Sequence, residues 1–265
     1  MNYENKIING DCIDVMKDFP PDIVDLAFTD PPYNLEKDYG LYVDSNDKEN
    51  YIHWTEQWLM EIIRVLKPTG SLYLLTLPKW AIHHSVFLDK FLYRRNTIAW
   101  DALSTPRGKI MPAHYSLLFY TKSHSYTFNQ IETKHNWTHC ARAKCTQERN
   151  TSSLEKRPFS DIWSNVHRIK HRGKRHAHHP TQLPFSFMER IILSSSNRND
   201  LVLDPFLGVG TTAIVSKLLR RKYLGIEINP EYVQESRKNV EQASTFRSRL
   251  ELIDQPQPRD LSTFL

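Results

Sequence analysis

The sequence predicts an α/β protein with a doubly wound, mostly parallel sheet. Short apolar runs of strand length alternate along the chain with longer stretches whose apolar residues recur at helical spacing. Several of the apolar runs end in turns rich in glycine, proline and aspartate. At 265 residues with 40% hydrophobic content, the chain can bury the core of one such domain with an insertion. Strands that alternate with helices pair in parallel and place ligands at the carboxyl edge of the sheet.

The individual elements follow from two periodicities. Strands are expected where short apolar runs are bounded by turn residues, at 6–8, 23–28, 71–76, 96–100, 115–120, 201–203 and 223–226. Helices are expected where apolar positions recur every three or four residues, at 50–66, 78–91, 184–196, 211–220 and 230–243. Residues 35–49 are acidic and lack periodicity, which indicates a loop. Between residues 127 and 178 the periodicity fades, and polar, basic and aromatic residues replace it.

Composition narrows the class of protein. A net charge of +5 and a pI near 9.0 fit a polyanionic partner without requiring one. No apolar run is long enough to span a membrane, and the first residues lack the features of a signal peptide. Three cysteines are too few for a disulfide framework and fit reduced thiols. We therefore expect a cytoplasmic protein.

The sequence Asp30-Pro31-Pro32-Tyr33 follows the expected strand 23–28 and has the composition of a catalytic turn. Two adjacent prolines fix the backbone and remove two N–H donors, so the turn can offer carbonyl acceptors beside the Asp30 carboxylate. Two acceptors suit the two hydrogens of an aromatic NH2 group, and Tyr33 could stack on the ring that carries this amine. The same letters are also common in purely structural turns.

A second turn, between strand 201–203 and the helix after it, has the pattern of a nucleoside site. Gly208 and Gly210 would let the backbone approach a ligand closely, and Thr211 and Thr212 are expected to cap the helix. Glu227 ends the next strand, about 20 residues further on, where an acid can accept hydrogen bonds from ribose hydroxyls. The third glycine of a dinucleotide fingerprint is missing, which argues against NAD.

Taken together, these residues resemble the amino-methyltransferase family of S-adenosylmethionine-dependent DNA methyltransferases. The family's D-P-P-Y matches residues 30–33, and its D-P-F-x-G-x-G-T-T cofactor loop matches residues 204–212. Its third cofactor element resembles Asn9-Gly10-Asp11-Cys12, and its H-P-T-x-K-P resembles residues 179–184, with Leu183 in place of the lysine. Residues 64–73 and 114–122 match two framework segments. The catalytic motif precedes the cofactor loop, as in the permuted subgroup called β.

The resemblance implies a Rossmann-like methyltransferase fold, the cofactor S-adenosylmethionine and a set of site residues. It divides the chain into a catalytic half (1–126), a target recognition insertion (127–178) and a cofactor-binding half (179–265). The catalytic residues would be Asp30, Pro31, Pro32 and Tyr33. The cofactor-binding residues would be Asp11, Cys12, Asp30, His179, Thr181, Asp204, Pro205, Phe206, Gly208, Gly210, Thr211, Thr212, Glu227 and Asn229. Double-stranded DNA is the implied partner, and a homodimer and a partner restriction endonuclease are left open.

Within the insertion, a run without acids carries five fixed positive charges. These residues are expected to contact DNA phosphates, although a solvated loop would look the same: Arg168, Lys170, Arg172, Lys174 and Arg175. Trp137, Arg142, Lys144 and Trp163 fit base contact and packing equally well. Four residues have soft side chains but match no common zinc module, so no metal is expected: His135, His139, Cys140 and Cys145.

The function that these observations predict is transfer of a methyl group to the amine of a flipped base, most simply adenine N6. Cytosine N4 is the nearest competing target, because cytosine presents the same edge around its amine. Cytosine members of the family more often carry serine at position 30, which favours adenine here. The sequence also leaves open an RNA or protein amino-group methyltransferase and a catalytically silent DNA-binding accessory subunit.

Overall fold

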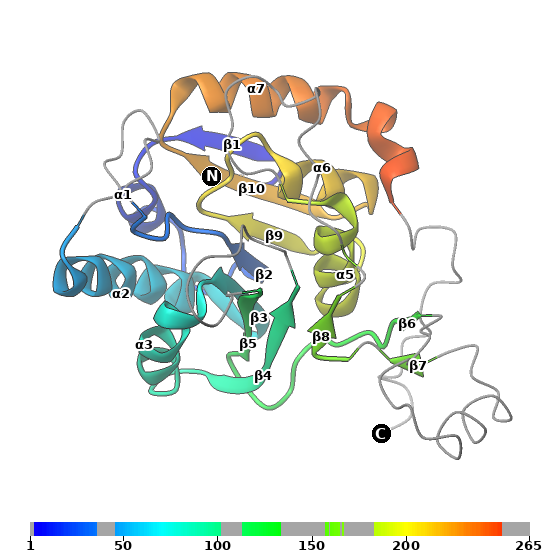
Figure 1. The fold of residues 1–265 in the computed structure, drawn as a ribbon. Helices are drawn as coiled ribbons and strands as arrows, with labels where there is room; N and C mark the ends of the chain where they lie inside the picture. Colours follow the sequence, from blue (N-terminus) through cyan, green and yellow to red (C-terminus); the bar gives the residue numbers. More distant parts are fainter. Residues whose placement is uncertain are drawn as a thin grey trace, which may run out of the picture.

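The computed structural model is built around an eight-stranded sheet with helices on both faces (Figure 1). It describes residues 3–35, 46–101, 113–133, 157–158, 160–164, 166 and 183–250. In spatial order the strands are β1 (Lys6–Asn9), β10 (Lys222–Glu227), β9 (Leu201–Asp204), β2 (Val24–Thr29), β3 (Leu66–Thr76), β5 (Tyr115–Thr121), β4 (Tyr93–Trp100) and β8 (Ile162–Trp163). A separate antiparallel pair joins β6 (Glu132–Thr133) to β7 (Arg157–Pro158).

The first five strands of the sheet, from β1 to β3, all run in parallel. Strand β5 is antiparallel to both of its neighbours, β3 and β4, and β8 runs parallel to β4. At the centre, β2 pairs with β9, with Leu26 opposite Val202 and Ala27 opposite Leu203. From this pair the chain proceeds outward in opposite directions, from β2 to β3 and from β9 to β10. Such a reversal opens a crevice at the carboxyl ends of the two strands.

The helices form two layers. One face of the sheet carries α1 (Cys12–Lys17), α2 (Lys48–Val65) and α3 (Pro78–Leu88), whose buried side chains share one apolar cluster. The other face carries α5 (Phe185–Ser195), α6 (Thr211–Leu218), α7 (Pro230–Glu241) and the 3-10 helix η1 (Ala243–Arg249). Figure 1 shows these two groups on opposite sides of the strands. Among the described residues, no helix combines the length and the apolar character needed to cross a membrane.

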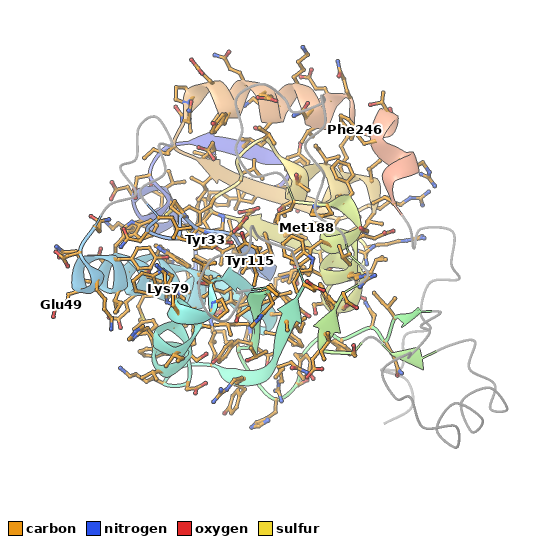
Figure 2. All side chains as sticks on the ribbon, in the orientation of Figure 1. Tyr33, Glu49, Lys79, Tyr115, Met188 and Phe246 are labelled. Atoms are coloured by element: carbon orange, nitrogen blue, oxygen red, sulfur yellow. The ribbon has the colours of Figure 1, made fainter. Side chains whose placement is uncertain are left out.

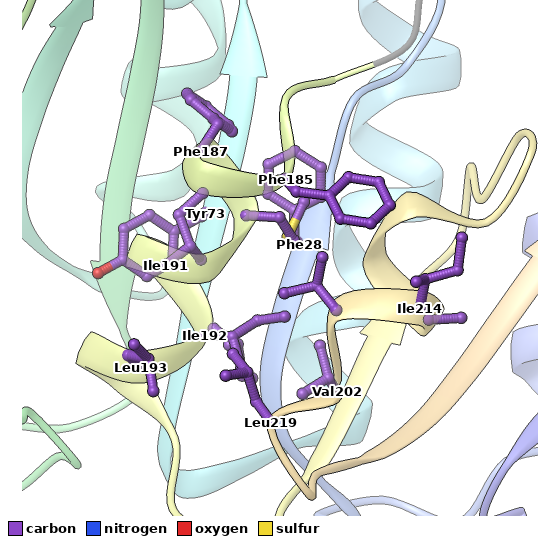
Figure 3. Close-up of a cluster of buried hydrophobic side chains, with 14 of the residues drawn as sticks. Phe28, Tyr73, Phe185, Phe187, Ile191, Ile192, Leu193, Val202, Ile214 and Leu219 are labelled. Carbon is purple, nitrogen blue, oxygen red and sulfur yellow. The ribbon is translucent and has the colours of Figure 1, made fainter. Parts of the chain in front are cut away.

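Helix α5 supplies much of the core on the second face (Figure 3). Every residue of this helix is buried, and Phe187, Ile191 and Ile192 are completely inaccessible. The Phe187 ring lies 4.5 Å from the Trp100 ring and 5.4 Å from the Trp163 ring, between centroids. Helix α5 therefore packs against β4 and against β8 at the edge of the sheet.

Most of the elements expected from the sequence are present, with shifted ends. Helix α1 is missing from the expectation because its six residues are too short to show periodicity. The expected loop 35–49 is too long, since α2 begins at Lys48 after the cap Asp47. Strand β8 lies within the expected insertion 127–178 yet pairs with the main sheet. Trp163 packs there, at 5% exposure, in the core.

The position of Phe187 makes it a test of the core. Replacing Phe187 by alanine removes a ring that is fully buried, so the free energy of unfolding should fall by about 3–5 kcal/mol. Phe128 is 51% exposed, and its replacement by alanine should cost less than about 1 kcal/mol. Urea titration of both variants, followed by circular dichroism, measures the two values, and equal losses would contradict the packing described.

Candidate active site

The sequence motifs meet at the carboxyl edge of the parallel strands. Asn9 pairs with Glu227 across β1 and β10, and Asp204 pairs with Gly225 across β9 and β10. Strand β9 in turn pairs with β2, which ends one residue before Asp30. Neighbouring strands lie about 5 Å apart, so these strand ends form one short row. The two turns that the sequence indicated therefore lie at the crevice between β2 and β9.

The turn after β2 is held by two aromatic donors from helices. The Tyr51 hydroxyl on α2 donates to the Pro32 carbonyl at 2.8 Å. The Trp80 indole N–H on α3 donates to the Tyr33 carbonyl, also at 2.8 Å. The Pro31 carbonyl, between these anchors and Asp30, receives no hydrogen bond from the part of the chain that the structure describes.

The side chain of Tyr33 folds back over the turn. Its hydroxyl donates to the Asp30 carboxylate, and its ring is 6% exposed. The ring centroid lies 5.7 Å from that of Tyr115 at the start of β5, and Figure 2 labels the two rings side by side. Tyr115 in turn lies 5.7 Å from Trp100. An aromatic wall therefore stands next to the one carboxylate of the turn, where a planar ring could stack.

Asp204 holds the turn after β9 together. It is 3% exposed, accepts the Phe206 N–H at 3.0 Å and accepts the Thr212 hydroxyl at 2.5 Å. The glycines adopt left-handed conformations, with φ of 55° at Gly208 and 95° at Gly210. Helix α6 begins after Gly210 and has no side-chain cap, so the expectation that Thr211 and Thr212 cap it is wrong. Both threonines lie inside the helix, and the Thr212 hydroxyl is committed to Asp204.

Glu227, at the end of β10, connects the neighbouring loops. Its carboxylate accepts the backbone N–H of Gly208 and that of Asn229, each at 2.8 Å. Asn229 uses its own side chain to cap α7, accepting the Glu231 N–H at 2.9 Å. At 9% exposure Glu227 is buried, and this burial raises the pKa of its carboxyl group. The acid expected to bind ribose thus also fixes the glycine turn beside it.

The segment after β1 completes the row. The Asn9 amide donates to the carbonyls of Glu227 at 2.8 Å and Ile228 at 2.9 Å, which joins β1 to β10. Asp11 caps α1 by accepting the Ile13 N–H at 2.8 Å. Cys12 is 5% exposed, and burial raises the pKa of its thiol, as befits a packed small residue rather than a nucleophile.

Three carboxylates converge at this edge and interact. Burial raises the pKa of the Asp204 carboxyl to about 7, and the charges of Asp30 and Glu227 add to the rise. The hydrogen bonds from Thr212 and Phe206 act in the opposite direction but do not cancel the effect of burial. Concentrated negative charge beside two left-handed glycines suits a ligand that carries positive charge and needs close backbone approach.

Several expected site residues lie outside the described part of the chain. They are the cofactor residues His179 and Thr181, the basic run Arg168, Lys170, Arg172, Lys174 and Arg175, and the metal candidates His135, His139, Cys140 and Cys145. Sequence reasoning missed the roles of Asn9, Tyr51 and Trp80, each of which holds a strand end or turn. An aromatic residue on the apolar face of a helix is expected to be a core residue, so no sequence signal distinguished Tyr51 and Trp80 from ordinary packing residues.

A family model described as N6/N4 methyltransferase, DNA methylase, matches residues 24–238, most of the chain and both turns. The chain belongs to this family. It is 38% identical to the type II methyltransferase M.BamHI of Bacillus amyloliquefaciens over 242 residues, which cover 88% of this chain and 57% of M.BamHI. It is 32% identical to the DNA adenine methyltransferase YhdJ of Escherichia coli over 262 residues, which cover 92% of this chain and 85% of YhdJ.

The fold agrees with solved structures. TTHA0409 of Thermus thermophilus, complexed with S-adenosyl-L-methionine, matches with a TM-score of 0.64 at 23% identity. The match covers 90% of this chain and 94% of TTHA0409. The predicted α/β fold and the predicted DNA methylase family are therefore confirmed. The assignment to the permuted β subgroup and the segment boundaries 1–126, 127–178 and 179–265 stay predictions.

The buried Asp204 predicts a specific pH dependence of stability. Its pKa is raised from 3.8 to about 7 in the folded protein, so the folded state binds this proton more tightly than the unfolded state. The free energy of unfolding should therefore fall as pH rises, by roughly 2–3 kcal/mol between pH 5 and pH 7.5. The substitution Asp204→Asn keeps both loop hydrogen bonds possible, because the threonine hydroxyl can rotate, and removes the ionisation.

Denaturant titrations of the cofactor-free protein and of Asp204→Asn across this pH range measure the effect. Other groups titrate in both proteins, so the difference between the two curves isolates Asp204. The free energy of unfolding of Asp204→Asn should increase relative to that of the wild type as pH rises. Curves that remain parallel would show that the Asp204 carboxyl does not change its proton occupancy in this range.

Proposed function

We propose that the protein is an S-adenosylmethionine-dependent methyltransferase that methylates adenine N6 in double-stranded DNA. The observation that carries the proposal is the position of the Asp30 turn: it follows β2, which pairs with β9, and the charge of Asp30 acts on Asp204 at the start of the glycine turn. Membership of the DNA methylase family supports the reaction class. The chain spans 57% of the length of M.BamHI, so the activity of the whole protein is part of the proposal.

The residues at the strand ends fit S-adenosylmethionine by their chemistry. Left-handed Gly208 lacks a side chain where the backbone would meet the cofactor. Gly210 is required for packing against α7, because an added Cβ atom would lie 3.0 Å from Ser236 Cβ. Glu227 and Asp11 would accept from the ribose hydroxyls and the adenine amine, and the carboxylates would favour the cofactor's positive charge. When bound, the cofactor supplies an activated methyl group on a sulfonium.

The chain's own contribution is to grip the target amine. The lone pair of an aromatic amine is delocalised into its ring, which makes the nitrogen a weak nucleophile. Acceptors at the Asp30 carboxylate and the Pro31 carbonyl would take its two hydrogens and draw the lone pair back to nitrogen. The flipped base would stack on Tyr33, within the aromatic wall formed with Tyr115. The Asp30 charge then stabilises the amine as it becomes cationic.

The target base rests on two observations. Asp30 stands where cytosine enzymes of the family more often carry serine, and YhdJ, 32% identical, is named a DNA adenine methyltransferase. Digestion of methylated plasmid to nucleosides, followed by mass spectrometry, would identify the product as N6-methyladenine. N4-methylcytosine as the sole product would refute the adenine assignment and retain the reaction class.

The partners and the location are proposed on the same basis. M.BamHI is a type II methyltransferase, and a restriction endonuclease that reads the same DNA site would be the matching partner of this chain. Residues 127–178 would recognise that site. We propose that the protein acts in the cytoplasm, either as a monomer or as a homodimer.

The sharpest prediction concerns Asp30. Asp30→Ala should reduce methyl transfer below about one thousandth of the wild-type rate, because an acceptor needed mainly in the transition state is lost. Asp30→Asn keeps one acceptor oxygen without the charge, so its rate of methyl transfer should lie between that of Asp30→Ala and that of the wild type. Although Asp30 is also among the residues expected near the cofactor, cofactor affinity should fall far less than the rate in both variants, since Asp11, the glycine turn and Glu227 are untouched.

Single-turnover transfer from tritiated S-adenosylmethionine measures the chemical step, and calorimetry measures cofactor binding. An alanine variant that keeps most of the wild-type rate would show that the turn is purely structural. A loss of cofactor binding equal to the loss of rate would instead place Asp30 in the cofactor site.

A separate prediction concerns the basic run at residues 168–175. Replacing Arg168, Lys170, Arg172, Lys174 and Arg175 by glutamine should weaken binding to every duplex and flatten its salt dependence, by roughly 0.9 in logarithmic slope per lost phosphate contact. The matched control neutralises five exposed cations elsewhere: Lys6, Lys17, Lys90, Arg94 and Lys238. Fluorescence anisotropy over a salt series gives both slopes. Equal changes in the two variants would mean that only net charge matters.

A further inference from the structure

Two buried aromatic donors hold the catalytic turn in place from the same side of the sheet. Tyr51 lies in the first turn of α2, and its backbone N–H bonds to the Asp47 carbonyl at 3.0 Å. Trp80 lies in the first turn of α3, with its backbone N–H bonded to the Leu77 carbonyl at 2.9 Å. Tyr51 is completely inaccessible and Trp80 is 6% exposed. Their rings pack against each other with centroids 4.5 Å apart.

The two donors bind consecutive carbonyls, those of Pro32 and Tyr33, and leave the carbonyl of Pro31 without a bond to either of them. Tyr51 donates to Pro32, Trp80 donates to Tyr33, and Pro31 receives no bond from the described residues. Prolines cannot donate, so Pro31 and Pro32 give the turn no N–H with which to fix itself. The Asp30 carboxylate is held from within the turn by the Tyr33 hydroxyl, but the position of the Pro31 carbonyl depends on the two anchors from outside it.

We propose that Tyr51 and Trp80 are positioning residues for methyl transfer, which set the place of the Pro31 carbonyl relative to Asp30. This inference rests on the proposed function. An amine held by two acceptors must point its lone pair along one line, and a displacement of about 1 Å at a reacting group can cost about a hundredfold in rate. Neither residue needs to contact the substrate to have this effect.

The same helix links the catalytic turn to the cofactor loop. Phe206, in the turn after β9, packs edge-on against two tryptophans of α2, with centroids 5.7 Å from Trp54 and 5.2 Å from Trp58. Trp54 lies 5.9 Å from the Tyr51 ring. Helix α2 thus contacts the amine-binding turn through Tyr51 and the cofactor loop through its tryptophans. A rigid α2 would keep these two turns, which come from different halves of the chain, at a constant separation.

The substitution Tyr51→Phe removes only the hydroxyl and leaves the ring packing intact. It should lower kcat about five- to tenfold at saturating DNA and cofactor, with KM and the cofactor Kd changed less than about twofold. Trp80→Phe should release the neighbouring Tyr33 carbonyl of the same turn and lower kcat by at least as much. Because both anchors fix one turn, the double variant should lose less than the product of the two single losses.

Tyr120→Phe is the matched control. Tyr120 is also completely buried on this face of the sheet, and its hydroxyl donates to Asp89 at 2.9 Å, close to the end of α3 and not to the turn. Like Tyr51→Phe, this variant loses the hydroxyl of a completely buried tyrosine, so its urea midpoint should fall about as far as that of Tyr51→Phe. Its kcat should stay within about twofold of the wild type.

Steady-state assays on the full chain measure kcat and KM, and urea titrations measure the stability of each variant. A lower kcat in Tyr51→Phe but not in Tyr120→Phe, with unchanged KM, supports positioning. Equal kcat values in these two variants would overturn it, because the Tyr51 hydroxyl would then contribute only to stability. If Trp80→Phe fails to fold, Tyr51→Phe and its control still give the answer. A wild type that transfers no methyl group would overturn the proposed function and this inference together.

Discussion

The parallel pairing of β2 with β9 is the constraint on which the site depends. It sets residues near position 26 beside residues near position 202, far apart in the chain, and brings the ends of both strands to one edge. The pairing is buried, since Leu26, Ala27, Val202 and Leu203 are all inaccessible. A slip of one residue would turn each of these side chains to the opposite face of the sheet. The register that fills the core therefore also fixes the separation of the Asp30 turn and the Asp204 turn.

The charges at this edge carry a cost that the fold tolerates. Burying a carboxylate is unfavourable unless donors compensate it, and among the described residues Asp204 receives the Thr212 hydroxyl and the Phe206 N–H, yet its pKa still rises to about 7. A neutral residue would cost less and would hold the turn as well. The acid makes physical sense if a cation binds nearby, because the cation would restore the charged form and gain affinity from it.

The sequence indicated those parts of the candidate site in which a residue type has a distinctive backbone or charge property. Prolines after a strand, glycines before a helix and an acid after the next strand led to Asp30, Gly208 and Glu227. The prediction that Thr211 and Thr212 cap the helix was wrong, because left-handed Gly210 occupies the N-cap position of α6 and the Thr212 hydroxyl donates to Asp204. Tyr51 and Trp80 could not be found, because an aromatic residue on an amphipathic helix looks the same whether its polar atom is used or not.

Helix α2 shows that one buried face of a helix can serve both the core and the candidate site. Its buried stripe comprises Tyr51, Thr55, Trp58, Leu59, Ile62 and Val65, a spacing that any core-facing helix would show. Yet the first turns of the stripe touch both the Asp30 turn and Phe206, whereas its later turns pack into the apolar core. The C-terminal part of this helix thus contributes to the stability of the core, and its N-terminal part holds the Asp30 turn in position. Substitutions near its N-terminus would disturb the reaction before the fold, and those near its C-terminus would disturb the fold first.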